Sequence, residues 1–114
     1  MKDDLKERII IFECNVTNEE QVKAAIEGTY KHYGAIHAAL ACAGVSFPIQ
    51  TLTSKKTLDT NVFKRVIDIN VYGSIYVAKY ASLYMAKNEP VNEFGEKGVI
   101  IFVSSVAAEE GQRG

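Results

Sequence analysis

The sequence predicts an α/β fold with a parallel sheet, because three short apolar runs alternate with helical patterns. The runs cover residues 8–12, 36–41 and 98–103, and each is rich in β-branched or small apolar residues. Runs of this length are typical of strands buried on both faces of a parallel sheet. A strand, a helix and a strand in succession favour parallel crossover units, which are nearly always right-handed.

The length and composition predict a single domain that has no nucleic-acid partner. The chain has 114 residues, 47% of them hydrophobic, and its 13 basic and 14 acidic residues are mixed along the sequence. Such a balance predicts no electrostatic footprint for nucleic acid. Cys14 and Cys42 match no metal-ligand spacing, so we expect no metal site and two buried free thiols in a reducing compartment. Neither a secretory signal nor a membrane span is visible.

The first helix is expected to begin at Thr17. Its hydroxyl can accept from the backbone three residues on while Glu20 reaches back, which is the capping-box arrangement. Apolar residues then recur at helical spacing, and Gly34 is expected to end the helix in the left-handed conformation. One face of this helix is expected to pack on the sheet.

A longer helix is predicted for residues 61–87, with Asp59 or Thr60 as its cap. Residues 46–59 before it are predicted to form a loop. Asn70 lies in the middle of the helix, where an Asn side chain competes with the backbone. On its own, the plainer interpretation of Asn70 is an exposed or capping residue that has no chemical role.

Small or polar residues follow the end of each predicted strand: Asn15-Val16, Cys42-Ala43-Gly44 and Ser104-Ser105. Parallel strands present their carboxyl ends on one side, so these segments should line a common crevice. Each segment also has a plainer explanation, because turn residues and strand-ending hydroxyls are common at such places.

The strand and serine pair of residues 98–105 resemble the catalytic-serine strand of short-chain dehydrogenases/reductases. Residues 88–90 (Asn-Glu-Pro) and 105–112 narrow the resemblance to the type 10 17β-hydroxysteroid/3-hydroxyacyl-CoA dehydrogenase branch. The resemblance covers nearly the whole chain and implies a three-layer Rossmann-like parallel sheet. In the strand order 3-2-1-4-5-6, this chain would hold strands 3 to 5. Residues 8–12 would then lack sheet neighbours, and their backbone would slide against another strand or stay disordered.

The resemblance also implies an NAD(H) site. Asn15 and Val16 match the family's Asp-Val pair, which contacts adenine, although Asn accepts without charge assistance. Cys42, Ala43 and Gly44 match a motif whose small residues let the backbone approach the cofactor ribose. Ala41 replaces the first Asn of that motif, so a hydrogen bond within the family's sheet should be missing.

Asn70 and Ser105 match two members of the family's catalytic tetrad. By resemblance, Asn70 opens the long helix locally and holds a water in a proton relay, while Ser105 hydrogen-bonds the substrate oxygen. The remaining members form a Tyr-x-x-x-Lys pair, and none of the six tyrosines has a lysine four residues later. The family's Gly-x-x-x-Gly-x-Gly phosphate-binding turn has no counterpart either.

We therefore expect an internal piece or truncated product of an NAD-dependent dehydrogenase of secondary alcohols, inactive as this chain. The implied substrates are 3-hydroxyacyl-CoA thioesters or hydroxysteroids, and the implied location is mitochondrial or cytoplasmic. An alternative is a non-catalytic interaction module, because the family helix that matches residues 61–87 packs against its twin in a homo-oligomer. A third reading is an unrelated small α/β domain.

Overall fold

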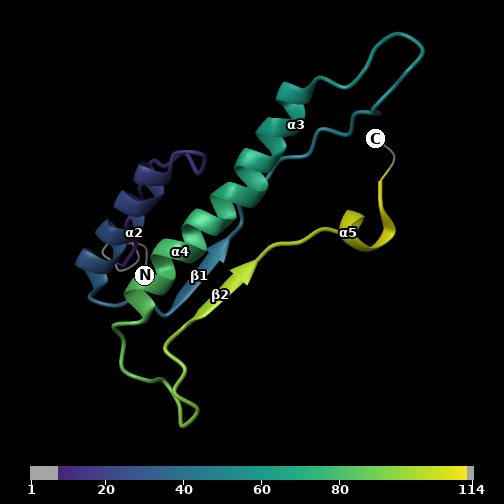
Figure 1. Ribbon diagram of the computed structural model, residues 1–114. Helices are drawn as coiled ribbons and strands as arrows, with labels where there is room; N and C mark the ends of the chain where they lie inside the picture. The colour runs from purple at the N-terminus through teal and green to yellow at the C-terminus, as the bar shows by residue number, and fades with distance from the viewer. Residues whose placement is uncertain (1–7, 113–114) are drawn as a thin grey trace.

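The computed structural model describes residues 8–112 and places two parallel strands against a long helix (Figure 1). The elements in chain order are α2 (Glu19–Tyr33), β1 (Ala38–Ala41), α3 (Thr60–Ile67), η1 (Asp68–Tyr72), α4 (Gly73–Met85), β2 (Val99–Phe102) and α5 (Ala107–Glu110). The π-helical turn η1 joins α3 and α4 into one continuous helix. In the sheet, Ala38 lies opposite Val99 and Ala41 opposite Phe102. The predicted incomplete, Rossmann-like α/β arrangement is confirmed.

The core lies between α4 and the strand pair. Ile36, Ala81 and Met85 are buried together, and the residues packed around them are Ile26, Tyr30, Ala39, Tyr84 and Ile100. The chain passes so close to Met85 at Gly98 that an added Cβ would lie 2.8 Å from the Met85 sulfur. On the other face of the sheet, Leu40 and Ile101 lie opposite each other and remain exposed. The expectation that α2 packs on the sheet was wrong, because α2 packs against α4, which lies between it and the strands.

Buried Asn88 connects the amino ends of the two strands. Its side-chain amide donates to the Ile36 carbonyl at 2.7 Å and to the Lys97 carbonyl at 2.8 Å. Each carbonyl belongs to the residue two positions before its strand begins. A buried carbonyl needs a hydrogen-bond partner, so one side chain satisfies both groups and fixes the spacing of the strands.

The prediction of a strand at residues 8–12 was wrong. The described residues give this segment no ladder partner, and its backbone bonds instead to Tyr33. The Tyr33 hydroxyl donates to the Arg8 carbonyl at 2.7 Å and accepts from the Ile10 amide at 3.1 Å. The Phe12 ring lies over Gly28, where a Cβ would come within 2.6 Å of it. A strand requires a neighbouring strand. The expectation that this segment would lack sheet neighbours is confirmed, but it neither slides against another strand nor stays disordered, because it packs against α2.

The predicted capping box at Thr17 was also wrong. The helix begins one residue later, because the Asn18 side-chain oxygen accepts from the Gln21 amide at 3.2 Å and caps α2. The Thr17 amide and hydroxyl both donate to the Asn15 side-chain oxygen, at 3.0 and 2.9 Å. Thr17 is therefore part of the turn before the helix.

Two other predicted helix ends are confirmed. Gly34 ends α2 with φ 81°, and its amide donates to the Tyr30 carbonyl. Asp59 caps α3 by accepting from the Asn61 amide at 2.9 Å. The predicted loop before α3 contains one antiparallel bridge, between Leu52 and Thr57, and is otherwise irregular. Within residues 8–112, no helix combines the length and apolar character needed to cross a bilayer.

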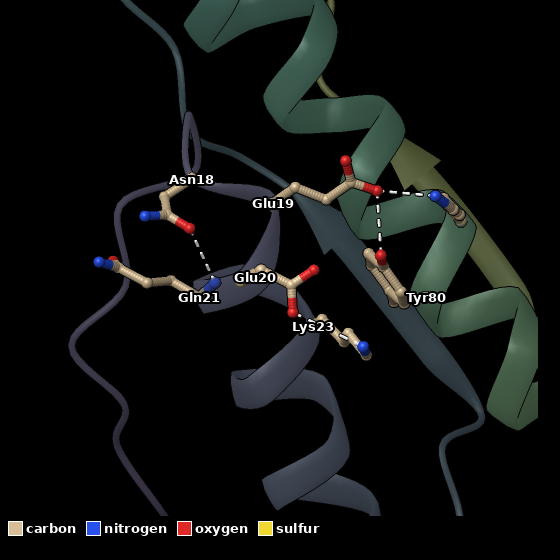
Figure 2. Close-up of polar contacts among 7 residues, drawn as sticks. Asn18, Glu19, Glu20, Gln21, Lys23 and Tyr80 are labelled. Carbon is tan, nitrogen blue, oxygen red and sulfur yellow. Dashed lines mark hydrogen bonds and ion pairs between the residues drawn. The ribbon is translucent and has the colours of Figure 1, made fainter.

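Glu19 connects the start of α2 to α4 (Figure 2). One of its carboxylate oxygens accepts from the Lys79 ammonium at 2.7 Å and from the Tyr80 hydroxyl at 2.9 Å. The hydrogen bond from Lys79, followed by that from Tyr80, lowers the pKa of Glu19 below its ordinary value. The same contact raises the pKa of Lys79. The cluster thus holds the two helices together through a charged contact at the protein surface.

Glu19 is predicted to make the fold sensitive to acid. Its pKa is lower in the folded chain than the ordinary 4.5, so its stabilisation is present above that pH and is lost as pH falls through the folded value. Acidification should therefore lower the urea midpoint of the unmodified chain more than that of Glu19→Gln. Glu20→Gln is the control, because Glu20 is exposed and lies 3.6 Å from Lys23 (Figure 2). Equal acid sensitivity in the unmodified chain and Glu19→Gln would contradict the role of Glu19.

Candidate functional site

The carboxyl ends of β1 and β2 form one wall of a cleft of about 690 Å³. The residues that line it come from three segments, and they are Ala41–Ser46 after β1, Asn70, Val71 and Ser74 on the long helix, and Val103, Ser104, Ser105 and Ala108 after β2. Two of the three segments predicted to share a crevice, those after β1 and β2, therefore line it together, whereas the prediction was wrong for Asn15-Val16, which does not line it. No charged side chain is present among these lining residues.

Asn70 clamps the segment that follows β1. Its side-chain oxygen accepts from the Val45 amide at 2.9 Å, and its side-chain nitrogen donates to the Val45 carbonyl at 2.9 Å. The Asn70 side chain thus satisfies both polar groups of one residue, as a neighbouring strand would. The clamp holds the chain just beyond β1 against the long helix.

The helix widens where Asn70 lies. The π-helical turn η1 covers Asp68–Tyr72, and π-turns of this kind occur frequently at functional sites. The Asn70 backbone carbonyl accepts a hydrogen bond from the Ser74 hydroxyl at 2.9 Å. One turn later, Gly73 permits close contact with Val16, since a Cβ on Gly73 would lie 2.9 Å from that side chain. The local opening of the helix at Asn70 is therefore present in the structure.

Ser105 is exposed at the start of the chain segment beyond β2. Its hydroxyl oxygen accepts from the Ala107 amide at 3.2 Å, in the turn that leads into α5. A hydroxyl carries one donor proton and two acceptor lone pairs. The bond to Ala107 uses a lone pair, so the proton can be donated to a ligand oxygen in the cleft.

On the side of the cleft that follows β1, the small side chains leave the backbone open to a ligand. A Cβ on Gly44 would lie 3.7 Å from the Asn70 oxygen, an ordinary contact, so packing within the chain does not require glycine there. The room above Gly44 is therefore available to a ligand that approaches the backbone closely. The prediction of a buried thiol at Cys42 was wrong, because the side chain is exposed where the chain leaves the sheet. Cys14 is half-buried, and burial raises the pKa of its thiol.

Asn15 and Val16 do not line the cleft with Asn70 and Ser105. Val16 borders a neighbouring pocket of about 220 Å³, whose lining residues Ala41, Cys42, Ala43 and Ser74 also line the cleft. The Asn15 side-chain oxygen accepts both hydrogen bonds from Thr17, and its amide donates to the Gln21 side chain at 2.8 Å. Asn15 therefore acts as a turn residue, and its contact with adenine stays a prediction.

Sequence reasoning missed Val45 and Ser74 as members of this site. Val45 directly follows the small-residue segment of residues 42–44. It joins the site through the hydrogen bonds of its backbone to Asn70, and any residue type could make such bonds, so the sequence does not reveal them. Ser74 is four residues after Asn70, a spacing that places a hydroxyl near the earlier carbonyl on a helix. As for metals, residues 8–112 contain no group of three or more His, Cys, Asp or Glu side chains that could hold an ion.

Comparison with known proteins gives consistent matches along the chain. The family model described as short chain dehydrogenase matches residues 1–114. The 3-hydroxyacyl-CoA dehydrogenase type-2 of Mus musculus is 40% identical in an alignment 114 residues long. This alignment covers 96% of this chain and 42% of that protein. The protein of the same name from Drosophila melanogaster is 33% identical over 113 residues, covering 97% and 44%.

Solved structures agree with these sequence matches. The 3-hydroxyacyl-CoA dehydrogenase type-2 from Mycobacterium avium has a TM-score of 0.78 and 32% identity, covering 90% of this chain and 40% of that one. ElxO with NADP bound has a TM-score of 0.79 and 28% identity, covering 97% and 41%. The chain thus spans less than half the length of the relatives that it matches.

Proposed function

The chain belongs to the short-chain dehydrogenase family, and from this membership we propose that it carries part of an oxidoreductase active site. The proposed reaction moves a hydride between NAD(H) and a secondary alcohol or its ketone. The observation that carries the proposal is that Asn70 and Ser105 border the same cleft at the carboxyl ends of two parallel strands. Of the two implied substrate classes, the names of the mouse and mycobacterial relatives favour 3-hydroxyacyl-CoA thioesters over hydroxysteroids.

In the proposed reaction, a bound nicotinamide would supply the acceptor for the hydride that leaves the alcohol carbon with its electron pair, and the hydroxyl proton would pass to a base. Ser105 would donate its hydroxyl proton in a hydrogen bond to the substrate oxygen and hold that oxygen in place. Asn70 would act on the site by fixing Val45, since both polar ends of its side chain are already bonded to that residue. The Asn70 backbone carbonyl accepts from Ser74, and its second lone pair would accept a hydrogen bond from the relay water.

The residues of the cleft fit part of a nicotinamide cofactor. Cys42, Ala43 and Gly44 are exposed and small, so a ribose could approach the backbone there. The 114 residues contain neither a glycine-rich phosphate-binding turn nor a Tyr-x-x-x-Lys pair. We therefore propose that this chain alone does not catalyse hydride transfer, because it provides no proton-accepting tyrosine and no pyrophosphate site.

Grafting tests the proposed role of Ser105. These 114 residues would replace the matching segment of the Mus musculus protein, and NADH formation from a 3-hydroxyacyl-CoA would be measured. The graft should be active, and Ser105→Ala should lower kcat by about 10²–10³-fold, the usual effect of removing one positioned donor.

The matched control is Ser104→Ala in the same graft, which should keep most of the activity. The 114-residue chain alone should form no NADH. A graft in which Ser105→Ala retains full activity would contradict the assignment, and NADH formation by the isolated chain would contradict its proposed inactivity.

Self-association is a second candidate function, favoured by exposed apolar side chains on the long helix. Val71, Ile75 and Leu83 are about half exposed, with exposed fractions of 48, 53 and 55%. Ala81, by contrast, is 1% exposed and belongs to the core, so a charge there would disrupt folding instead of testing association.

Sedimentation of the isolated chain tests this second candidate. The unmodified chain should sediment as an oligomer, and the double variant Ile75→Glu, Leu83→Glu should shift it to a monomer. Glu substituted at Val91, which is also exposed but lies beyond the helix, is the control. A monomeric unmodified chain would rule out association through this surface.

A further inference from the structure

Ser74 lies on the wall of the cleft, one turn after Asn70 on the long helix. Its hydroxyl donates to the Asn70 backbone carbonyl at 2.9 Å, and both residues line the cleft. The helix is wider just before this point, because the Gly73 amide donates to the Asp68 carbonyl five residues earlier, as in a π-helix. The hydrogen bond from Ser74 therefore connects α4 back to the π-turn where the helix borders the cleft.

The geometry of this hydrogen bond is ordinary. A serine or threonine within a helix can bond to the carbonyl four residues earlier, and α2 contains such a bond. The Thr29 hydroxyl donates to the Ala25 carbonyl, also at 2.9 Å. Thr29 does not line the cleft, whereas Ser74 does. The two bonds thus differ in their place in the fold and not in their geometry.

The hydrogen bond makes the Ser74 oxygen an acceptor toward the cleft. A serine hydroxyl has one proton and two lone pairs, and at Ser74 the proton is committed to the Asn70 carbonyl. A carbonyl oxygen also has two lone pairs, of which Ser74 uses one. Two acceptor oxygens, 2.9 Å apart, therefore stand side by side on the helix wall of the cleft.

Ser105, on the other wall of the cleft, has the opposite polarity. Its oxygen accepts from the Ala107 amide, so its proton is the group that it can offer a ligand. The described lining of the cleft contains no charged side chain, so neutral hydrogen bonds would orient a small polar molecule there. A water molecule that gives both protons to Ser74 and the Asn70 carbonyl would keep its own lone pairs free to accept a proton.

We propose that Ser74 is a positioning residue of the proton relay, because its oxygen and the Asn70 carbonyl together hold the relay water. The inference rests on the proposed function, which supplies the proton that this water accepts. The water takes the proton that leaves the base and passes a proton on to solvent. Ser74 itself neither gains nor loses a proton, and the base returns to its starting state.

The variants Ser74→Val and Ser74→Thr test this role in the graft of these 114 residues into the Mus musculus protein. Valine and threonine have nearly the same shape, so the two variants differ in the hydroxyl. Ser74→Val should lower kcat by about tenfold, the effect of one lost hydrogen bond, and change KM by less than roughly twofold. Ser74→Thr keeps the hydroxyl and should keep the activity.

Imidazole buffer separates a relay defect from a structural one. In Ser74→Val, added imidazole should restore much of the lost rate, because a soluble base can carry the proton in place of a poorly held water. Thr29→Val is the matched control, since it removes the same type of bond away from the cleft and should leave kcat unchanged. In the isolated Ser74→Val chain, the Val45 amide should still exchange slowly, because the Asn70 clamp is intact.

Any of four results would overturn the role of Ser74. They are full activity of Ser74→Val, a loss of rate that imidazole leaves unchanged, an equal loss in Thr29→Val, and a freely exchanging Val45 amide in Ser74→Val. A graft without substitutions that forms no NADH would refute the proposed reaction and this inference together. An active graft in which Ser105→Ala lowers kcat and Ser74→Val does not would refute the inference alone.

Discussion

The site depends on the pair of hydrogen bonds between the Asn70 side chain and the Val45 backbone. Val45 is four residues beyond β1, where no strand continues to hold the chain. The clamp fixes this segment to the long helix, and the segment forms a wall of both the cleft and a second cavity, between residues 45–49 and α3. Each such bond contributes about 0.5–1.5 kcal/mol net, but an unpartnered half-buried peptide would cost more. One amide side chain therefore shapes both cavities.

The π-turn and the clamp are parts of one arrangement. Asn is unfavourable within a helix because its side chain competes for backbone partners. At Asn70 the side chain is committed to Val45, and the π-helical turn surrounds it at Asp68–Tyr72. Gly73 follows immediately, and its missing side chain admits Val16. The long helix thus contacts the segment after β1 through Asn70 and the segment before α2 through Gly73, about one turn later.

Asn88 and Asn70 stabilise opposite ends of a small sheet. Each strand has four residues, and a two-stranded sheet of this size is marginally stable in water. Asn88 joins the amino ends through the Ile36 and Lys97 carbonyls, and the core around Ala81 backs one face. Asn70 anchors the chain beyond the carboxyl end of β1. The cleft is therefore built on a strand pair that is fixed near both ends and backed by a helix.

Much of this arrangement could be predicted from the sequence, because local patterns determine it. Apolar runs predicted β1 and β2, helical spacing predicted the long helix, and Gly34 predicted the end of α2. Residues 8–12 have the same apolar pattern, but a strand also needs a neighbour, which residue type does not report. The start of α2 was placed wrongly because Thr17 and Asn18 are both good caps, and the bond from Thr17 to Asn15 decided between them.

The clamp itself could not be predicted, since its partner is a backbone group 25 residues away. Its direct test is the state of the Asn70 side-chain amide in solution, measured by nuclear magnetic resonance. The account predicts slowed hydrogen exchange of one Asn70 amide proton and a scalar coupling across the hydrogen bond from the Val45 amide. An Asn70 side chain that exchanges as fast as exposed Asn61, without coupling to Val45, would contradict it.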